Sequence, residues 1–379
     1  MYFTLRPVKG ERFINRQELL DEMISELRDV ESTTGYALYG KRRIGKTSVL
    51  KEVQRRLESE HKIVTVYFSV WDLIEFSVVE FCQRLSMEII DAYRPYLGLK
   101  YKAKELFQTP LTMLRKLLDS SEFKIVYNEL EFLISKKRDI DKNLLVENAL
   151  YLPEKLAKST GTKCILMIDE FPSISELKSD NNKIGETIIK KMRTIFENWE
   201  RTTLCISGSI RSTMKLSVLS SISPFYRQLI IKEVKPFERE YTKELLSGDI
   251  EITEEGVDEI HNFSTGIPFY VQFIGKMLER RKGASVELIK ELEEEFLLEE
   301  GDILFKEEFD TLSSKERLIA INIAKGCHTP KAIASAVGDN ISNVNQFLTY
   351  LEQKGYVLKR EKGYYILEDP VFVRWLEGL

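Results

Sequence analysis

The sequence predicts an α/β protein whose parallel β-sheet carries a helical insertion and is followed by an all-α lid and a winged-helix domain. Short β-rich runs alternate with long amphipathic segments through the first 235 residues. The β runs cease after Pro236, and the residues after Phe305 read as three helices followed by a hairpin. We therefore expect an α/β domain at residues 1–236, a helical lid at 237–303 and a winged helix-turn-helix domain at 304–379.

The predicted strands are short apolar runs that are rich in β-branched and aromatic residues. They are Tyr36–Tyr39, Ile63–Ser69, Cys164–Asp169, Thr203–Ser207 and Leu229–Val234. Their alternation with amphipathic segments is typical of a parallel sheet. Between the second and third runs, a long helical stretch from Phe76 to Ser159 is broken near Pro95 and Pro110, and this stretch is the predicted insertion.

The C-terminal third is predicted to be mostly helical. Helical patterns run from about Glu238 to Glu300, and this predicted lid includes the acidic segment 287–300. The winged helix follows with helices at 314–325, from Thr329-Pro330 onward, and at 340–354, and with strands at 356–360 and 364–367.

Bulk composition describes a globular protein with 43% hydrophobic and 31% charged residues. The net charge of −4 argues against a surface built wholly for nucleic acid, since such binding depends on Lys and Arg at phosphates. The four cysteines make no metal-ligand spacing with the histidines. No stretch approaches the roughly 20 apolar residues of a membrane span, so we expect a cytoplasmic protein without a membrane partner.

A phosphate-binding loop follows the first predicted strand. It matches the G-x-x-x-x-G-K-[ST] pattern, known as Walker A, with a strand before it and a helix after it. Its residues are Gly40, Lys41, Arg42, Arg43, Ile44, Gly45, Lys46, Thr47 and Ser48. The glycines let backbone N–H groups wrap a phosphate, Lys46 supplies charge to the β- and γ-phosphates, and Thr47 is a ligand for Mg²⁺. The motif predicts a nucleoside triphosphate bound with Mg²⁺.

Two adjacent carboxylates follow the third predicted strand. Asp169 and Glu170 end the apolar run that begins at Cys164, and such a pair is costly unless a cation or substrate stabilises it. We expect Asp169 to act on Mg²⁺ through a coordinated water, and Glu170 to polarise the attacking water. A simple surface turn after the strand is the alternative.

Other polar residues at strand ends give weaker signals. Ser207 or Ser209 could sense the γ-phosphate from the strand beside Asp169, although a turn made of small residues explains them as well. Arg211 or Arg227 could stabilise charge on the transferred phosphoryl group, within the chain or across a subunit boundary. Solvated or ion-paired arginines are the alternative.

Taken together, the motifs resemble those of the archaeal ATPase family, in the STAND and AAA+-like branch of P-loop nucleoside triphosphatases. The matching segments are Phe13–Leu19, Gly40–Ser48, Ile168–Phe171, Ser207–Ser209, Ser223–Arg227 and Gly266–Tyr270. The resemblance implies ATP and ADP as the nucleotides, a helical lid and a C-terminal winged helix. It also places Phe13 and Arg16 near the adenine, and Pro268 against the base, where it couples nucleotide state to the lid. A plain helix-start turn is the alternative for Gly266-Ile267-Pro268.

The winged helix could contact DNA or dock a protein. The segment from Thr311 to Leu379 contains nine basic and seven acidic residues, so its net charge is close to neutral. The expected recognition helix offers polar groups that can bond base edges: Ser342, Asn343, Asn345, Gln346 and Thr349. Only Lys359, Arg360 and Lys362 in the wing suit phosphate. Both interpretations stay open, as does self-association.

The leading functional hypothesis is an ATP-hydrolysing switch, in which Mg-ATP closes the lid and winged helix on the sheet domain and hydrolysis releases them. The alternatives are a DNA-binding regulator or repair factor whose affinity the nucleotide tunes, and an inactive ATP-binding scaffold.

Overall fold

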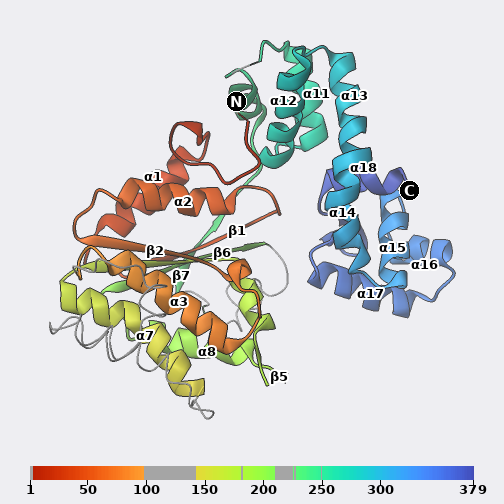
Figure 1. The fold of residues 1–379 in the computed structure, drawn as a ribbon. Coiled ribbons are helices and arrows are strands. Elements are labelled where there is room, and N and C mark those ends of the chain that lie inside the picture. Colours follow the sequence, from red (N-terminus) through yellow and green to blue (C-terminus); the bar gives the residue numbers. More distant parts are fainter. Residues whose placement is uncertain (1–2, 98–141, 181, 210–224, 226–227, 249) are drawn as a thin grey trace.

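A five-stranded parallel sheet forms the centre of the N-terminal domain (Figure 1). The computed structural model describes residues 3–97, 142–180, 182–209, 225, 228–248 and 250–379. The strand order is β2-β3-β6-β1-β7. The strands are β1 (Gly35–Gly40), β2 (Ile63–Ser69), β3 (Lys163–Asp169), β6 (Thr202–Ser209) and β7 (Leu229–Glu233). The predicted α/β fold with a parallel sheet is confirmed, and each predicted strand is found with its ends shifted by at most two residues.

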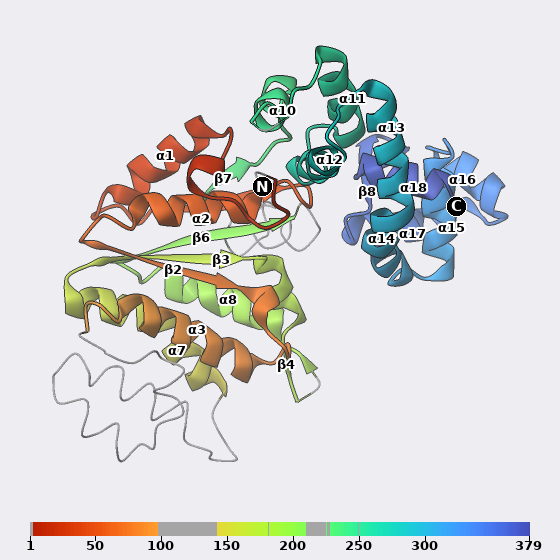
Figure 2. The same ribbon diagram turned by 45° about the horizontal axis from the view of Figure 1, so that its top comes forward.

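Helices cover both faces of the sheet (Figures 1 and 2). Helices α1 (Gln17–Arg28) and α2 (Lys46–Leu57) lie on one face. The other face carries α3 (Val78–Tyr93), α7 (Lys142–Thr160) and α8 (Gly185–Phe196). All seven residues of β3 are buried, as expected for a strand covered on both faces. The predicted insertion thus contains α3 and α7, while its residues 98–141 lie outside the described part.

Two short elements lie between β3 and α8. The 3₁₀ helix η3 (Phe171–Glu176) begins immediately after Glu170, and it leads into the small hairpin of β4 (Lys178–Ser179) and β5 (Asn182–Lys183). Another 3₁₀ turn, η2 (Val70–Asp72), continues β2 at the same edge of the sheet. The carboxyl ends of β2 and β3 therefore lead into short 3₁₀ turns, and a site can form beside them.

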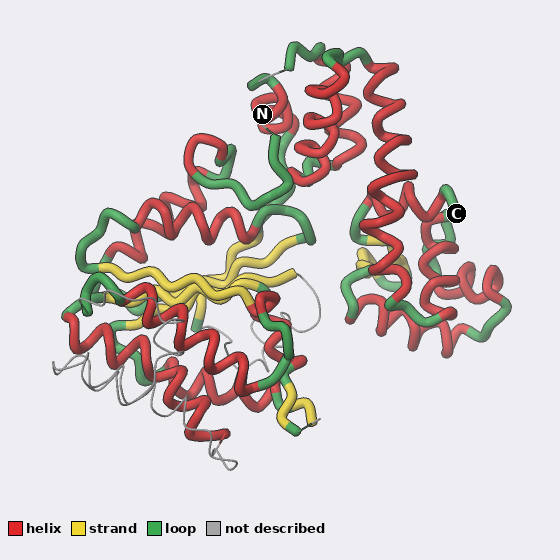
Figure 3. The backbone as a smooth tube through the Cα atoms, viewed as in Figure 1, coloured by secondary structure: helices red, strands yellow, loops and turns green. Residues whose placement is uncertain are grey.

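The helical lid, residues 239–295, consists of four helices. They are α10 (Arg239–Leu246), α11 (Glu254–Ser264), α12 (Pro268–Arg281) and α13 (Val286–Glu295). A π-helical turn at Phe296–Glu300 joins α13 to α14 (Gly301–Asp310), and Figure 3 shows the resulting helical run toward the C-terminal part. The predicted domain boundary between residues 303 and 304 falls inside α14, because the chain continues as helix across it.

The C-terminal unit, residues 301–379, follows the order that the sequence predicts for a winged helix. After α14 come α15 (Ser314–Ala324), α16 (Pro330–Val337) and α17 (Ile341–Gln353), then the antiparallel hairpin of β8 (Val357–Glu361) and β9 (Tyr364–Leu367). A final helix, α18 (Pro370–Glu377), was not predicted. Its start signal is nonetheless visible in the sequence, because Asp369 caps the helix and Pro370 takes its first position.

Candidate functional site

The phosphate loop connects β1 to α2 at the carboxyl edge of the sheet. Gly45 has a φ of 93° before the first turn of α2, a conformation that suits glycine. At Gly40 a Cβ atom would lie 2.5 Å from the carbonyl oxygen of Val234, so only glycine fits this approach of loop to strand end. The twelve-residue helix α2 begins directly after Gly45. The amides in the first turn of a helix have no acceptor within the helix, so those of α2 can bind an anion.

The Lys46 side chain folds back over the phosphate loop. It is almost fully buried, with 5% exposure, and its ammonium donates to the carbonyl oxygens of Gly40 at 3.1 Å and Lys41 at 2.9 Å. Burial lowers the pKa of Lys46, while the nearby carboxylates of Glu170 and Asp169 act in the opposite direction. A buried ammonium of this kind is a strong site for anion binding, because little water competes for it.

Asp169 is the centre of a hydrogen-bond cluster formed by three strands and the loop. Its side chain is 3% exposed. The hydroxyl of Thr47 donates to Oδ2 at 2.6 Å, that of Tyr67 donates to the same oxygen at 2.8 Å, and that of Ser207 donates to Oδ1. The amide of Glu170 adds a fourth bond to Oδ1 at 3.1 Å. These donors fix the carboxylate directly beside Thr47.

Ser207 and Ser209, the predicted γ-phosphate sensors, lie on β6 beside Asp169. Ser207 is fully buried and its hydroxyl binds Asp169, so it orients that carboxylate in this structure. Strand register explains this, because Ile168 pairs with Ile206 and the next residues lie side by side. Ser209 ends β6 and is nearly buried. Arg211 and Arg227 lie outside the described residues.

Glu170 has left-handed backbone geometry with a φ of 52°. Such a conformation costs roughly 1 kcal/mol for a residue with a Cβ atom, and strained residues of this kind cluster at functional sites. The turn is held by a hydrogen bond from the amide of Ser173 to the carbonyl of Glu170 at 2.9 Å. It brings Glu170 into the lining of the same cavity as Lys46 and Thr47.

A cavity of about 340 Å³ extends from the phosphate loop to the lid. Its lining comes from the N-terminal segment (residues 3–16), the loop, Glu170 and the start of α12. Phe13, Arg16 and Pro268, which the family resemblance places near the base, all line it, as do Arg42 and Arg43. Phe237, Leu245 and Phe269 give the cavity apolar walls, against which an aromatic base would pack.

Arg16 contacts both an apolar wall of the cavity and the phosphate loop. Its guanidinium lies 5.1 Å from the ring centre of Phe237 and donates to the carbonyl oxygen of Ile44. Burial lowers the pKa of Arg16 to about 10, so it remains charged at neutral pH.

The N-terminal segment covers the cavity by bridging α2 and α12, an arrangement that sequence reasoning missed. The amide of Val8 donates to Ser48 Oγ at 3.1 Å, and that of Thr4 donates to Gln272 Oε1 at 2.9 Å. The ring of Phe3 lies against Gly275, where a Cβ atom would approach it to 2.5 Å. The segment therefore contacts both the P-loop helix and the lid, and no local pattern in the sequence indicates these two contacts.

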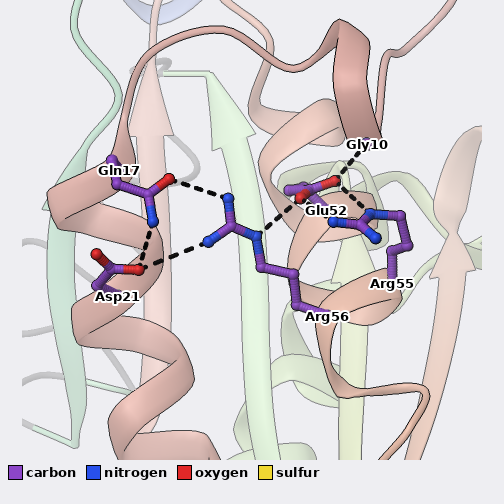
Figure 4. Close-up of polar contacts among 6 residues, drawn as sticks. All are labelled: Gly10, Gln17, Asp21, Glu52, Arg55 and Arg56. Atoms are coloured by element: carbon purple, nitrogen blue, oxygen red, sulfur yellow. Dashed lines mark hydrogen bonds and ion pairs between the residues drawn. The ribbon is translucent and has the colours of Figure 1, made fainter.

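Glu52 anchors this segment to α2 (Figure 4). Its carboxylate is 1% exposed and accepts from the amide of Gly10 at 2.7 Å and from the guanidinium groups of Arg55 and Arg56, each at 2.8 Å. Arg56 in turn donates to Gln17 on α1 at 3.0 Å. Burial alone would raise the pKa of Glu52, but the bonds from Arg55, Gly10 and Arg56 outweigh it and lower the pKa to about 2.

We expect Glu52→Gln to reduce stability at neutral pH but not in strong acid. The pKa falls from 4.5 to about 2 on folding. The charged form therefore stabilises the fold above pH 4.5, and this contribution is lost as the pH falls toward 2. At pH 7 the free energy of unfolding should fall by about 3 kcal/mol. Urea unfolding at pH 7, 4.5 and 3 measures it, with Glu58→Gln on the exposed end of the same helix as control; an equal loss at all three pH values would contradict the assignment.

The phosphate loop also contacts the C-terminal unit, and this contact was not predicted. Glu308 of α14 forms ion pairs with Arg42 at 2.5 Å and with Arg43 at 3.0 Å. Arg43 also pairs with Asp369 at 3.5 Å, and its guanidinium lies 5.8 Å from the ring centre of Phe269. Asp369 caps α18 and accepts a hydrogen bond from Tyr270 of α12. The loop, lid and C-terminal unit therefore meet at one cluster.

Within the described residues, the structure holds no group of three or more His, Cys, Asp or Glu side chains arranged around a possible metal position. The helices of the same residues are too short or too polar to traverse a lipid bilayer.

Comparison with known proteins gives matches over most of the chain. A family model described as an ATPase domain predominantly from Archaea matches residues 13–274. An uncharacterized ATP-binding protein of Methanocaldococcus jannaschii is 24% identical over 179 residues, which are 46% of this chain and 46% of that protein.

Solved structures are similar over nearly the full length. The Walker-type ATPase PABY2304 of Pyrococcus abyssi has a TM-score of 0.67 at 17% identity, with 99% of each chain covered. The Orc2 protein of Aeropyrum pernix has a TM-score of 0.54 at 14% identity, with 97% of this chain and 96% of that chain covered. Orc1 of the same organism has a TM-score of 0.50 at 13% identity, covering 99% and 94%. At these identities the likeness establishes the fold.

Proposed function

The chain belongs to the family of ATPase domains predominantly from Archaea, and we propose that it is a Mg²⁺-dependent, ATP-hydrolysing switch. Its nucleotide state would control the position of the helical lid and of the C-terminal unit, which we propose to be a winged helix. Membership in an ATP-binding family is shown by the comparisons; hydrolysis, Mg²⁺ and switching are proposals that rest on the geometry of the site.

Each part of the cavity has a proposed role in ATP binding and cleavage. The loop amides and Lys46 would hold the β- and γ-phosphates, and Phe13, Arg16 and Pro268 would enclose the adenine and ribose. Glu170 would act as the general base that orients the attacking water. Its place in the cavity lining beside Lys46 and Thr47 supports this role.

The oxygen ligands beside the loop suit Mg²⁺. The Thr47 hydroxyl and the Asp169 carboxylate lie 2.6 Å apart, and Mg²⁺ prefers few protein oxygens together with phosphates and water. Thr47 would be a direct ligand. Asp169 would accept hydrogen bonds from the Thr47 hydroxyl and from a metal-bound water. When bound, the metal supplies positive charge that stabilises the transferred phosphoryl group.

The observation that carries the switch proposal is the pairing of Arg42 and Arg43 with Glu308. These arginines belong to the phosphate loop, whereas Glu308 belongs to α14 at the start of the C-terminal unit. Glu308 lines the cavity together with Lys46 and Thr47. A ligand that contacts the loop therefore acts directly on the contact that holds the C-terminal unit.

The sign of the coupling follows from charge. A γ-phosphate held by Lys46 brings added negative charge into the cavity that Glu308 lines, and it competes with Glu308 for Arg42. ADP lacks that phosphate and leaves the pairs in place. We therefore propose that ATP weakens the contact with the C-terminal unit relative to ADP, which is opposite in sign to the closure suggested by the sequence.

Distance measurements between the sheet domain and the C-terminal unit test this switch. Spin labels at Glu58→Cys and Lys331→Cys, both exposed positions, report the separation by double electron–electron resonance in a Cys327→Ser background. The other three cysteines are buried. We expect a longer or broader distance distribution with a non-hydrolysable ATP analogue than with ADP.

Glu308→Gln removes the charge that competes with phosphate. In this variant the ADP-bound distance distribution should resemble that of the ATP-analogue state, because Arg42 and Arg43 both lose their ion pair with Glu308. Glu307→Gln, on the exposed side of the same helix, is the matched control and should behave as wild type. Identical distributions with ADP and analogue in the wild type would refute the switch.

A second candidate function is DNA binding through the C-terminal unit. It is favoured by the exposed wing cations Lys359, Arg360 and Lys362, and Orc1 of Aeropyrum pernix, which is similar in fold, is described in complex with DNA. Against it, polar groups on α17 bond within the unit: Asn343 to Asp339 and Gln346 to Tyr350. The salt dependence of DNA affinity separates the two, since phosphate contacts require a steep slope.

A further inference from the structure

Tyr67 is a polar contact of the site that neither the motif nor the family resemblance includes. Its hydroxyl donates to Asp169 Oδ2 at 2.8 Å, and that oxygen also accepts the bond from Thr47 at 2.6 Å. Tyr67 and Thr47 therefore share one carboxylate oxygen, and a displacement of one partner alters the position available to the other.

Strand pairing explains why Tyr67 reaches Asp169. In the parallel pair of β2 and β3, Tyr67 pairs with Met167 and Ser69 pairs with Asp169. Residues two apart on a strand point to the same face, so Tyr67 lies diagonally across from Asp169 on the face covered by α2. Thr47 is in the first turn of α2, which brings the three groups together.

The Tyr67 ring is held from the side of α2. The ammonium of Lys51, one turn after Thr47 on that helix, lies 4.9 Å from the ring centre. A tyrosine hydroxyl carries its proton at neutral pH, and Tyr67 donates it to Asp169 in this structure. The phenol thus acts as a fixed donor toward Asp169, with Lys51 covering its ring.

We propose that Tyr67 is a positioning residue for the metal site: it fixes Asp169 so that Thr47, whose hydroxyl donates a hydrogen bond to that carboxylate, presents an oxygen lone pair to Mg²⁺. The proposal rests on the proposed Mg-ATP function. A hydroxyl can donate to one group and coordinate another through its lone pairs, so the orientation of Asp169 determines that of Thr47. Partners that orient a metal-binding group typically change metal affinity or activity by about 10- to 100-fold when removed.

Tyr67→Phe removes only the hydroxyl and keeps the ring under Lys51. The readout is Mn²⁺ affinity of the protein bound to a non-hydrolysable ATP analogue, measured by electron paramagnetic resonance of free Mn²⁺ with protein in excess. We expect the affinity to fall about tenfold. Affinity for the analogue in EDTA should remain within twofold of wild type, because Tyr67 does not line the cavity wall described above.

Tyr96→Phe is the matched control, since it also loses a tyrosine hydroxyl bond, to the carbonyl of His61 at 3.1 Å, ahead of β2. It should leave Mn²⁺ affinity unchanged. Lys51→Met provides a second variant should Tyr67→Phe unfold, and by loosening the ring it should weaken Mn²⁺ binding about threefold.

The outcomes separate this inference from the function on which it rests. If the wild type binds the analogue and Mn²⁺ tightly but both Tyr67→Phe and Lys51→Met bind Mn²⁺ as wild type, Tyr67 has no positioning role and the ATPase proposal stands. If the wild-type complex binds Mn²⁺ no better than the free analogue does, the proposed metal site and the proposed role of Tyr67 are both wrong.

Discussion

Glu170→Gln is expected to lower ATP turnover by about 10²- to 10⁴-fold while nucleotide affinity stays near that of wild type. Glutamine keeps the size and polarity of the side chain but cannot accept a proton from water. The left-handed backbone at Glu170 is set by the turn into η3, which the substitution does not change. Phosphate release under saturating Mg-ATP measures turnover, and binding of a fluorescent ATP analogue measures affinity.

The control for this variant is Glu176→Gln, at the far end of the same 3₁₀ helix. Glu176 pairs with Lys183 of the small hairpin and does not contribute to the cavity lining. Its turnover should match wild type. If Glu170→Gln retained full turnover, the Glu170 carboxylate would have no role as a general base.

Lys46→Ala is expected to weaken ATP binding by about 100-fold, the second largest effect. A charge-assisted hydrogen bond contributes about 1.5–3 kcal/mol, and the Lys46 ammonium can reach two phosphates. In this structure the ammonium is nearly buried and bonded to the carbonyls of Gly40 and Lys41, so it is already directed into the loop. Calorimetric titration with Mg-ATP gives the affinity.

The same substitution also removes a donor from two loop carbonyls, so its thermal midpoint must be measured beside its affinity. Lys62→Ala, at an exposed position before β2, is the control for loss of a lysine. Wild-type affinity in a folded Lys46→Ala protein would show that the phosphates bind elsewhere.

Contiguous patterns in the sequence predicted the parts of the site that lie in contiguous segments. The phosphate loop and the Asp169-Glu170 pair each occupy one stretch next to an apolar strand, and the structure places both at the carboxyl edge of the sheet. A short apolar run bounded by polar residues predicts a strand, and β2 and β9 were predicted with their observed ends for this reason. The roles of these residues in binding and catalysis remain predictions.

Contacts between distant segments could not be predicted in the same way. Tyr67 meets Asp169 only because β2 and β3 are neighbours in register, and the order of strands is not written in either segment. Arg43 and Glu308 are separated by 265 residues, and their pairing depends on a continuous helix from α13 into α14. Periodicity describes single elements, whereas these contacts depend on how the elements pack.

Calorimetric titration of the wild-type protein with ATP, in the presence of Mg²⁺ and repeated at two temperatures, tests the central claim that the cavity at the phosphate loop binds Mg-ATP. We expect one saturable site per chain, with weaker binding when EDTA replaces the metal. The absence of saturable binding at both temperatures, by a correctly folded protein, would contradict it.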